Sequence, residues 1–93
     1  MQEIELDGRR MDTRALAHAH LKRQLNLPAY YGNNLDALAD CLGELSDCAI
    51  VLRYPNAMLN ALGPYGQQIL KVFQQASLGR RDFRFRAEGL RQG

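Results

Sequence analysis

Residues 27–52 read LPAYYGNNLDALADCLGELSDCAIVL, and this stretch holds a turn, a helix and a strand in succession. Residues 28–34 are turn formers around two tyrosines, and Asn33 or Asn34 is a suitable N-cap for the helix that follows. Leucines then recur at helical spacing, which predicts one apolar stripe along that helix. They are Leu35, Leu38, Leu42 and Leu45. The unbroken apolar run at residues 49–52 is typical of a strand covered on both faces.

The rest of the chain continues the succession of strands and helices. Alternating apolar patterns predict strands at residues 3–7 and 82–86. Further helices are predicted from a cap at Asp12 or Thr13 to about Asn26, and over residues 56–62 and 66–76. Because strands separated by helices favour a parallel sheet, we expect an α/β fold, with a small three-stranded parallel sheet flanked by about four helices. It would form a single domain over residues 1–88, with a frayed tail at residues 89–93.

Charge is unevenly distributed along the 93 residues, whose formal net charge is +2. The stretch between Gln24 and Arg53 contains four carboxylates and no Lys or Arg. They are Asp36, Asp40, Glu44 and Asp47. Spacings of four, four and three place them on one helical stripe almost opposite the leucines, although like charges one turn apart cost a helix roughly 0.2–0.5 kcal/mol per pair. Such a stripe is a candidate docking surface for a positively charged partner.

Two tyrosines stand directly before this acidic stripe. Tyr30 and Tyr31 precede the flexible Gly32, and we expect both side chains to be exposed. Exposed aromatic side chains beside charges are typical of protein recognition surfaces, where they often supply much of the binding energy. The tyrosine loop and the acidic helix are therefore predicted to form one binding site.

Cysteine and hydropathy patterns indicate a reduced, cytoplasmic protein without metal or cofactor. If Cys41 and Cys48 lie on one helix, they are separated by roughly 10 Å of rise, which is too far for a disulfide unless the helix ends between them. Two cysteines and two histidines at these spacings do not form a zinc site. No hydrophobic leader and no apolar run long enough to span a bilayer is visible in the sequence.

Catalysis by paired carboxylates is the first enzymatic alternative, since Asp36 and Asp40 could act as general acid and base. Neither lies in an apolar run that would raise its pKa, and no Ser-His or Cys-His arrangement is visible. His18 and His20 are interpreted as structural residues, partly buried or on the surface. We therefore expect no enzymatic activity.

Nucleic-acid binding is the second alternative, because arginines cluster near the C-terminus. They are Arg80, Arg81, Arg84, Arg86 and Arg91. Phe83 and Phe85 alternate with two of them, so these rings would lie on the opposite strand face and could not stack on bases beside the arginines. The pattern is more typical of a solvated strand face, and nucleic acid is the less favoured partner.

Residues 27–42, LPAYYGNNLDALADCL, strongly resemble the hallmark segment of the barstar family of bacterial ribonuclease inhibitors. A weaker similarity extends over nearly the whole chain. The resemblance implies a small three-stranded parallel sheet flanked by helices and no catalytic activity. It also implies an immunity role, in which the protein plugs the active site of a secreted ribonuclease inside the producing cell. The expected partner is a small basic ribonuclease or a similar cationic protein, with no membrane involved.

The same resemblance implies individual roles for residues of this segment. Asp40 would stand in for the substrate phosphate among the cations of the ribonuclease, and Asp36 would be a second contacting aspartate. Tyr30 would cover the catalytic histidine of the ribonuclease. Further contact positions match Gly32, Asn34 and Leu35. Apart from the resemblance, Glu44 and Asp47 lie a further turn or two along the chain and would only reinforce the negative field.

The sequence also departs from the family pattern. Ala39 and Leu45 replace tryptophans, and Gln75 on the last helix replaces a contacting glutamate. Family members are acidic overall, whereas this chain is net positive. Long-range steering toward a basic ribonuclease should therefore be weaker, although steering acts mainly on the association rate.

Overall fold

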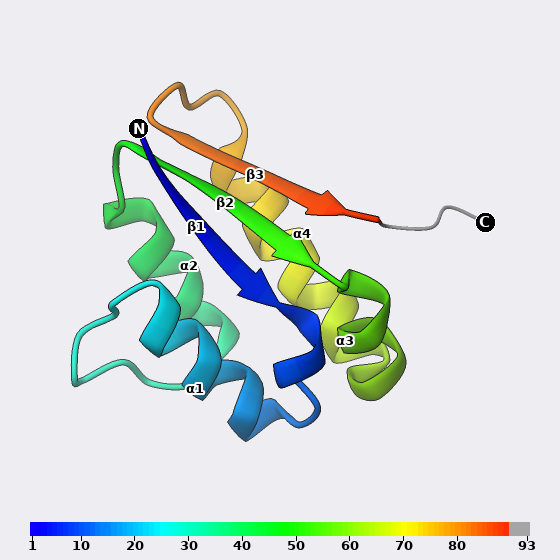
Figure 1. The fold of residues 1–93 in the computed structure, drawn as a ribbon. Helices are drawn as coiled ribbons and strands as arrows, with labels where there is room; N and C mark the ends of the chain where they lie inside the picture. The colour runs from blue at the N-terminus through cyan, green and yellow to red at the C-terminus, as the bar shows by residue number, and fades with distance from the viewer. Residues whose placement is uncertain (90–93) are drawn as a thin grey trace.

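A computed structural model describes residues 1–89, within which the chain forms three strands, four α-helices and one 3-10 turn (Figure 1). In chain order they are β1 (Gln2–Asp7), η1 (Gly8–Arg10), α1 (Arg14–Gln24), α2 (Leu35–Glu44), β2 (Cys48–Arg53), α3 (Pro55–Leu62), α4 (Pro64–Ser77) and β3 (Phe83–Glu88). The predicted α/β fold is confirmed. The last strand continues two residues beyond its predicted end. Of the tail predicted at residues 89–93, residues 90–93 lie outside the described part.

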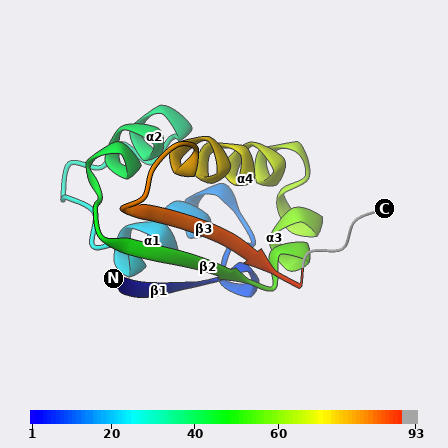
Figure 2. The ribbon, with the colours of Figure 1, turned by 90° about the horizontal axis from the view of Figure 1, so that it is seen from above.

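The three strands are parallel and lie in the order β1-β2-β3. Because the strand order follows the chain order, right-handed crossovers carry both helical connections over the same face of the sheet. Register places Ile4, Ile50 and Phe85 side by side on the inward face. The helices therefore form one layer against one face of the sheet, and Figure 2 shows α2 and α4 side by side in that layer.

Within residues 1–89, no helix covers the other face of the sheet. Glu3, Glu5, Arg84 and Arg86 are exposed there. The expectation that the central strand is covered on both faces was therefore wrong. Val51 is buried because it lies between Glu5 and Arg86 on the neighbouring strands, not because a second helical layer covers it.

The core lies between the sheet and the helices. Leu38 and Leu42 of the predicted leucine stripe are completely buried, and Leu35 and Leu45 pack at its margin. This burial contributes roughly 1.5–3 kcal/mol for each fully buried leucine. The leucine stripe therefore fixes α2 to the core and leaves its opposite face in solvent.

Helix α2 ends at Glu44, so Asp47 does not belong to it. Asp47 has a φ of 58°, in the turn that leads into β2. The predicted stripe of four helical carboxylates is therefore one of three. Asp47 falls outside it because the chain must turn before Cys48 N–H donates to the Asp82 carbonyl and strand pairing begins.

Arg80 closes the C-terminal end of α2. Its guanidinium donates to the Leu42 carbonyl at 2.9 Å and to the Leu45 carbonyl, and it pairs with Asp82 at 3.1 Å. A cation beside the last carbonyls of a helix is stabilising, because those carbonyls have no partner within the helix. Arg80 is thus a structural cap, and it belongs neither to the expected solvated strand face nor to a cluster available for phosphate.

No helix among residues 1–89 is long and apolar enough to cross a bilayer.

Candidate functional site: the tyrosine loop and the acidic face of α2

The loop that precedes α2 is held by Asn34, one of the two predicted caps. The Asn34 side-chain oxygen accepts from the Ala37 backbone N–H at 2.7 Å, and its amide donates to the Gly32 carbonyl at 3.2 Å. A single side chain therefore satisfies one of the first free N–H groups of the helix and ties the loop to the helix start. A Cβ on Gly32 would lie 3.1 Å from the Asn34 amide, so the loop is tightly packed there.

The two neighbouring tyrosines have opposite environments. Tyr30 is 83% exposed, as expected. Tyr31 is 5% exposed, so the expectation that both rings face solvent was wrong for Tyr31. Burial raises the pKa of its hydroxyl far above the ordinary value, so the group stays protonated. Tyr31 anchors the loop, and Tyr30 is free to contact a partner.

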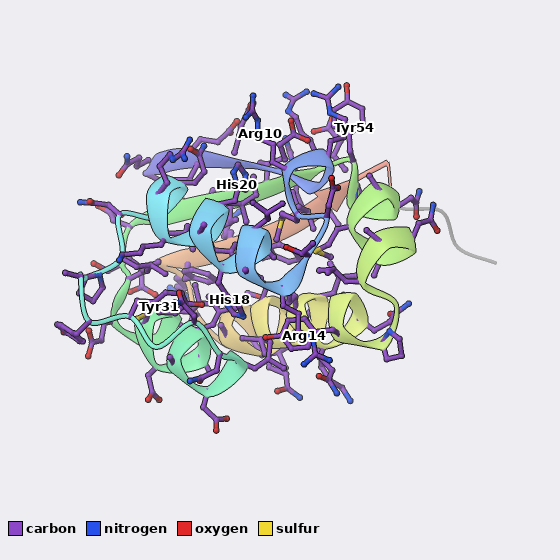
Figure 3. All side chains as sticks on the ribbon, turned by 90° about the horizontal axis from the view of Figure 1, so that it is seen from below. Arg10, Arg14, His18, His20, Tyr31 and Tyr54 are labelled. Carbon is purple, nitrogen blue, oxygen red and sulfur yellow. The ribbon has the colours of Figure 1, made fainter. Side chains whose placement is uncertain are left out.

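Tyr31 is held by a hydrogen bond to His18, which lies on the buried side of α1. Its Nδ1 lies 2.6 Å from the Tyr31 hydroxyl, and its Nε2 lies 2.6 Å from the hydroxyl of Tyr65 at the start of α4. A neutral imidazole donates from one nitrogen and accepts at the other, so one tyrosine donates to it and one accepts. Figure 3 shows His18 and Tyr31 close together between α1 and α2. This chain of three side chains ties the loop to two helices, and we refer to it as the tyrosine–histidine anchor.

Both histidines are almost completely buried, more than the sequence interpretation allowed. His18 is 1% exposed and His20 is 8% exposed. Burial lowers the pKa of each ring. Both histidines are buried because they form hydrogen bonds with residues distant in sequence. The spacing of apolar residues along α1 does not reveal these contacts.

Asp36, Asp40 and Glu44 lie exposed along one face of α2. None of the three forms an ion pair with any residue in positions 1–89. Asp36 in the first turn interacts favourably with the helix dipole, whereas Glu44 in the last turn does not. The negative charges of Asp40 and Glu44 therefore do not stabilise the fold through an ion pair or through the helix dipole.

Two cations border this surface in space although the sequence window contains none. A groove beside the start of α2 is lined by Arg14 and Lys22 of α1 together with Leu35 and Asp36. Both cations are partly engaged: the Arg14 guanidinium lies 4.2 Å from the centre of the Tyr65 ring, and Lys22 donates to the Ala29 carbonyl at 3.5 Å. Sequence reasoning missed them because α1 and α2 meet only in the folded chain.

Ala39 and Gln75 line one groove between α2 and α4. Both are exposed, and Leu78, which is 74% exposed, lies beside them. The structure thus brings Gln75 to the acidic face from the other end of the chain. The small Ala39 therefore forms part of the wall of this groove, opposite residues of α4.

Metal and thiol chemistry find little support in the part of the chain that is described. No group of three or more His, Cys, Asp or Glu side chains there could hold a metal ion. Cys41 and Cys48 are free cysteines, and burial raises the pKa of both thiols. A thiol with a raised pKa is a poor nucleophile, because the thiolate is the reactive form.

The geometry therefore defines a small α/β protein with a preformed acidic surface, supported by a buried anchor. Comparison with known proteins assigns it to a family. A family model described as "Barstar (barnase inhibitor)" matches residues 1–88. The chain is also 40% identical over 78 residues to a protein of Bacillus subtilis (strain 168) named "Putative ribonuclease inhibitor YrdF", covering 82% of this chain and 86% of that protein. The chain belongs to the barstar family, as its sequence resemblance predicted.

Proposed function

We propose that this protein inhibits a small ribonuclease by inserting the acidic face of α2 and the tyrosine loop into the cationic active site of that enzyme. The observation that carries the proposal is the set of three exposed, unpaired carboxylates on α2 beside the exposed ring of Tyr30. A ribonuclease must bind phosphate, so its active site presents cations. Asp40, at the middle of the stripe, would take the place of a substrate phosphate there.

Support for binding without turnover comes from the rigidity of the site and from the family. Asn34 and the tyrosine–histidine anchor fix the loop before any partner arrives. A preformed surface loses little conformational entropy on binding. Tyr30, Gly32, Asn34, Leu35, Asp36, Ala39, Asp40, Glu44 and Gln75 would make up the contact surface.

The setting proposed for this inhibition is the cytoplasm of the cell that makes the ribonuclease. The inhibitor would act there as an immunity protein, before the enzyme is secreted. The net charge of +2 would limit long-range attraction to a basic enzyme. Affinity would therefore depend on close contacts at α2, which govern dissociation more than association.

A titration of ribonuclease activity tests the proposal. Increasing amounts of the protein are added to each of a panel of small bacterial ribonucleases at fixed concentration, and RNA cleavage is measured. We expect activity to fall linearly to an end point near equimolar ratio for at least one enzyme, with Asp40→Ala greatly weakening that inhibition. If no ribonuclease is inhibited near equimolar ratio, and Asp40→Ala changes binding to no cationic protein, the proposal fails.

The nucleic-acid alternative loses part of its basis in the structure. Arg80 caps α2, and Arg86 lies 3.8 Å from Glu88. Arg81 and Arg84 remain exposed and outside any ion pair in residues 1–89. If these arginines bound RNA, affinity would fall steeply with salt, so a flat filter-binding curve at low salt would remove this alternative.

A further inference from the structure

A basic pocket lies at the carboxyl ends of β1 and β2, away from the acidic face of α2. It is lined by four arginines, Arg9, Arg10, Arg23 and Arg53, and by His20 and Tyr54. Figure 3 shows Arg10 and Tyr54 on the opposite side of the molecule from α2, with His20 directed toward the strands. The four arginines therefore gather around a single hollow at one edge of the sheet.

The walls of the pocket are fixed by a close backbone approach. A Cβ on Gly8 would lie 2.1 Å from the Tyr54 carbonyl oxygen, so only glycine allows η1 to pack against the end of β2. Tyr54 itself has a φ of 55°, in the left-handed region that most residues avoid. Two segments far apart in sequence are thus held together, and their side chains surround the same space.

Half of the positive charge in the pocket is already neutralised. Arg9 donates to both oxygens of Asp7, at 3.1 and 3.0 Å, while its guanidinium lies 3.9 Å from the centre of the Tyr54 ring. Arg53 pairs with Glu5 at 3.0 Å.

Arg10 and Arg23 supply the remaining charge. Neither forms an ion pair within the described residues, so two positive charges in the pocket are uncompensated. A dianionic group matches that excess.

His20 also lines the pocket and is held in place by a backbone contact. Its Nε2 accepts from the Asp7 backbone N–H at 2.9 Å, so the neutral ring carries its proton on Nδ1. Burial lowers the pKa of His20, the nearby Asp7 carboxylate raises it, and the charges of Arg10 and Arg23 lower it. A bound anion would offset the two charges that now destabilise a protonated His20.

We propose that this pocket binds a phosphate group, either as inorganic phosphate or as a phosphate monoester, with Arg10 and Arg23 pairing with its oxygens. Guanidinium groups match phosphate oxygens in geometry as well as charge, and a monoester carries nearly two negative charges at neutral pH. The phosphate comes either free or on a nucleotide. Tyr54 is 51% exposed, so its ring offers a surface for the base of a nucleotide. This site is independent of the proposed ribonuclease-binding surface.

An NMR titration of the full chain at low salt tests the proposal with inorganic phosphate, adenosine 5′-monophosphate and adenosine. We expect saturable shifts of the backbone amides of residues 7–10, 20–24 and 53–54 with both phosphate compounds and none with adenosine. The dissociation constant should be on the order of 1 mM, as expected for two charge-assisted contacts. Tighter binding of the nucleotide would identify a nucleotide ligand, and equal binding would identify free phosphate.

Two matched double variants distinguish phosphate binding in this pocket from non-specific attraction to the positive charge of the protein. Arg10→Gln/Arg23→Gln should weaken phosphate binding by at least about tenfold, whereas Arg84→Gln/Arg86→Gln, which removes the same charge from the outer sheet face, should change it less than about twofold. The first pair should change ribonuclease inhibition by less than about threefold, through steering alone, and Asp40→Ala should leave phosphate binding unaffected. The proposal is overturned if no saturable shifts occur, if both pairs weaken binding equally, or if adenosine gives the same shifts.

Discussion

The acidic face of α2 and the basic pocket at the strand ends use their charges differently. In the pocket, both carboxylates, Glu5 and Asp7, form ion pairs with arginines. On α2, no carboxylate forms an ion pair with a residue of the described chain. The carboxylates of the pocket are paired within the fold, whereas those of α2 remain available. The availability of the α2 carboxylates is what the proposed inhibition would use.

The largest predicted effect is on binding through α2. Asp36→Asn/Asp40→Asn should weaken ribonuclease inhibition by more than about 3 kcal/mol, over a hundredfold, because each substitution strands a cation of the enzyme at the interface. The free energy of unfolding should change by less than about 1 kcal/mol, since relief of repulsion offsets the lost dipole interaction of Asp36. Inhibition titrations and urea denaturation measure the two quantities.

Glu3→Gln/Asp12→Asn provides the matched control. Both side chains are exposed, neither forms an ion pair in residues 1–89, and neither lies on α2. This pair removes the same net charge, so inhibition should change by less than about threefold, through steering alone. Equal losses in the two pairs would show that net charge, and not the α2 face, determines binding.

The two neighbouring tyrosines provide the next test. Tyr31→Phe should lower the free energy of unfolding by about 1–3 kcal/mol, because it leaves a buried nitrogen of His18 without a partner. Tyr30→Phe should change it by less than about 0.5 kcal/mol, since Tyr30 is almost fully exposed. Tyr30→Ala should instead weaken inhibition by about 2 kcal/mol. Loss of stability in Tyr30→Phe, or none in Tyr31→Phe, would contradict the division between anchor and contact residue.

Stability should also depend on pH through His18 and His20. The folded-state pKa of each lies below the ordinary value of 6.5, so the unfolded chain binds protons that the folded chain excludes. The free energy of unfolding should therefore be constant above about pH 7 and fall as pH drops below about 6.5, by at most about 1.4 kcal/mol per pH unit for each histidine.

The contribution of His18 to this pH dependence can be measured on its own. His18→Gln should flatten the decline between pH 7 and 5, although it lowers stability at every pH by disrupting the tyrosine–histidine anchor. Urea denaturation at several pH values measures it. A wild-type stability that rises on acidification from pH 7 to 5 would be inconsistent with neutral, buried rings.

The smallest predicted effect concerns the groove between α2 and α4. Gln75→Glu adds a carboxylate beside Ala39, at a position where the family pattern has a glutamate, and should strengthen inhibition by about 1 kcal/mol, or roughly fivefold. Asn56→Asp, on α3 outside this groove, adds the same charge as a control. If the two variants strengthen inhibition equally, Gln75 does not face the partner.

Local patterns in the sequence were sufficient for most of the fold and for the exposed half of the site. The leucine spacing predicted α2 and its buried side, and therefore also predicted that Asp36 and Asp40 face solvent. Asn34 was recognised as a possible cap because its contact with Ala37 spans only three residues. Interactions within one helical turn are encoded by neighbouring residues, so spacing alone reveals them.

Contacts between distant segments could not be predicted in this way. Tyr31 is buried against His18, which also forms a hydrogen bond with Tyr65, 47 residues away in the sequence. The C-terminal end of α2 is capped by Arg80, which lies at least 35 residues further along the chain. The basic pocket likewise joins η1 to Tyr54 through the close approach at Gly8. The sequence showed arginines and tyrosines at these positions but not which of them meet.

Competition at the ribonuclease active site tests the central claim most directly. The protein is titrated by calorimetry into a ribonuclease that it has been found to inhibit. The titration is done with the ribonuclease alone and again with a 3′-mononucleotide bound in the ribonuclease active site. At a nucleotide concentration about 100 times its own dissociation constant, the apparent affinity for the protein should fall about a hundredfold. An apparent affinity that does not change with nucleotide would mean that the acidic face of α2 binds elsewhere, and would contradict the account.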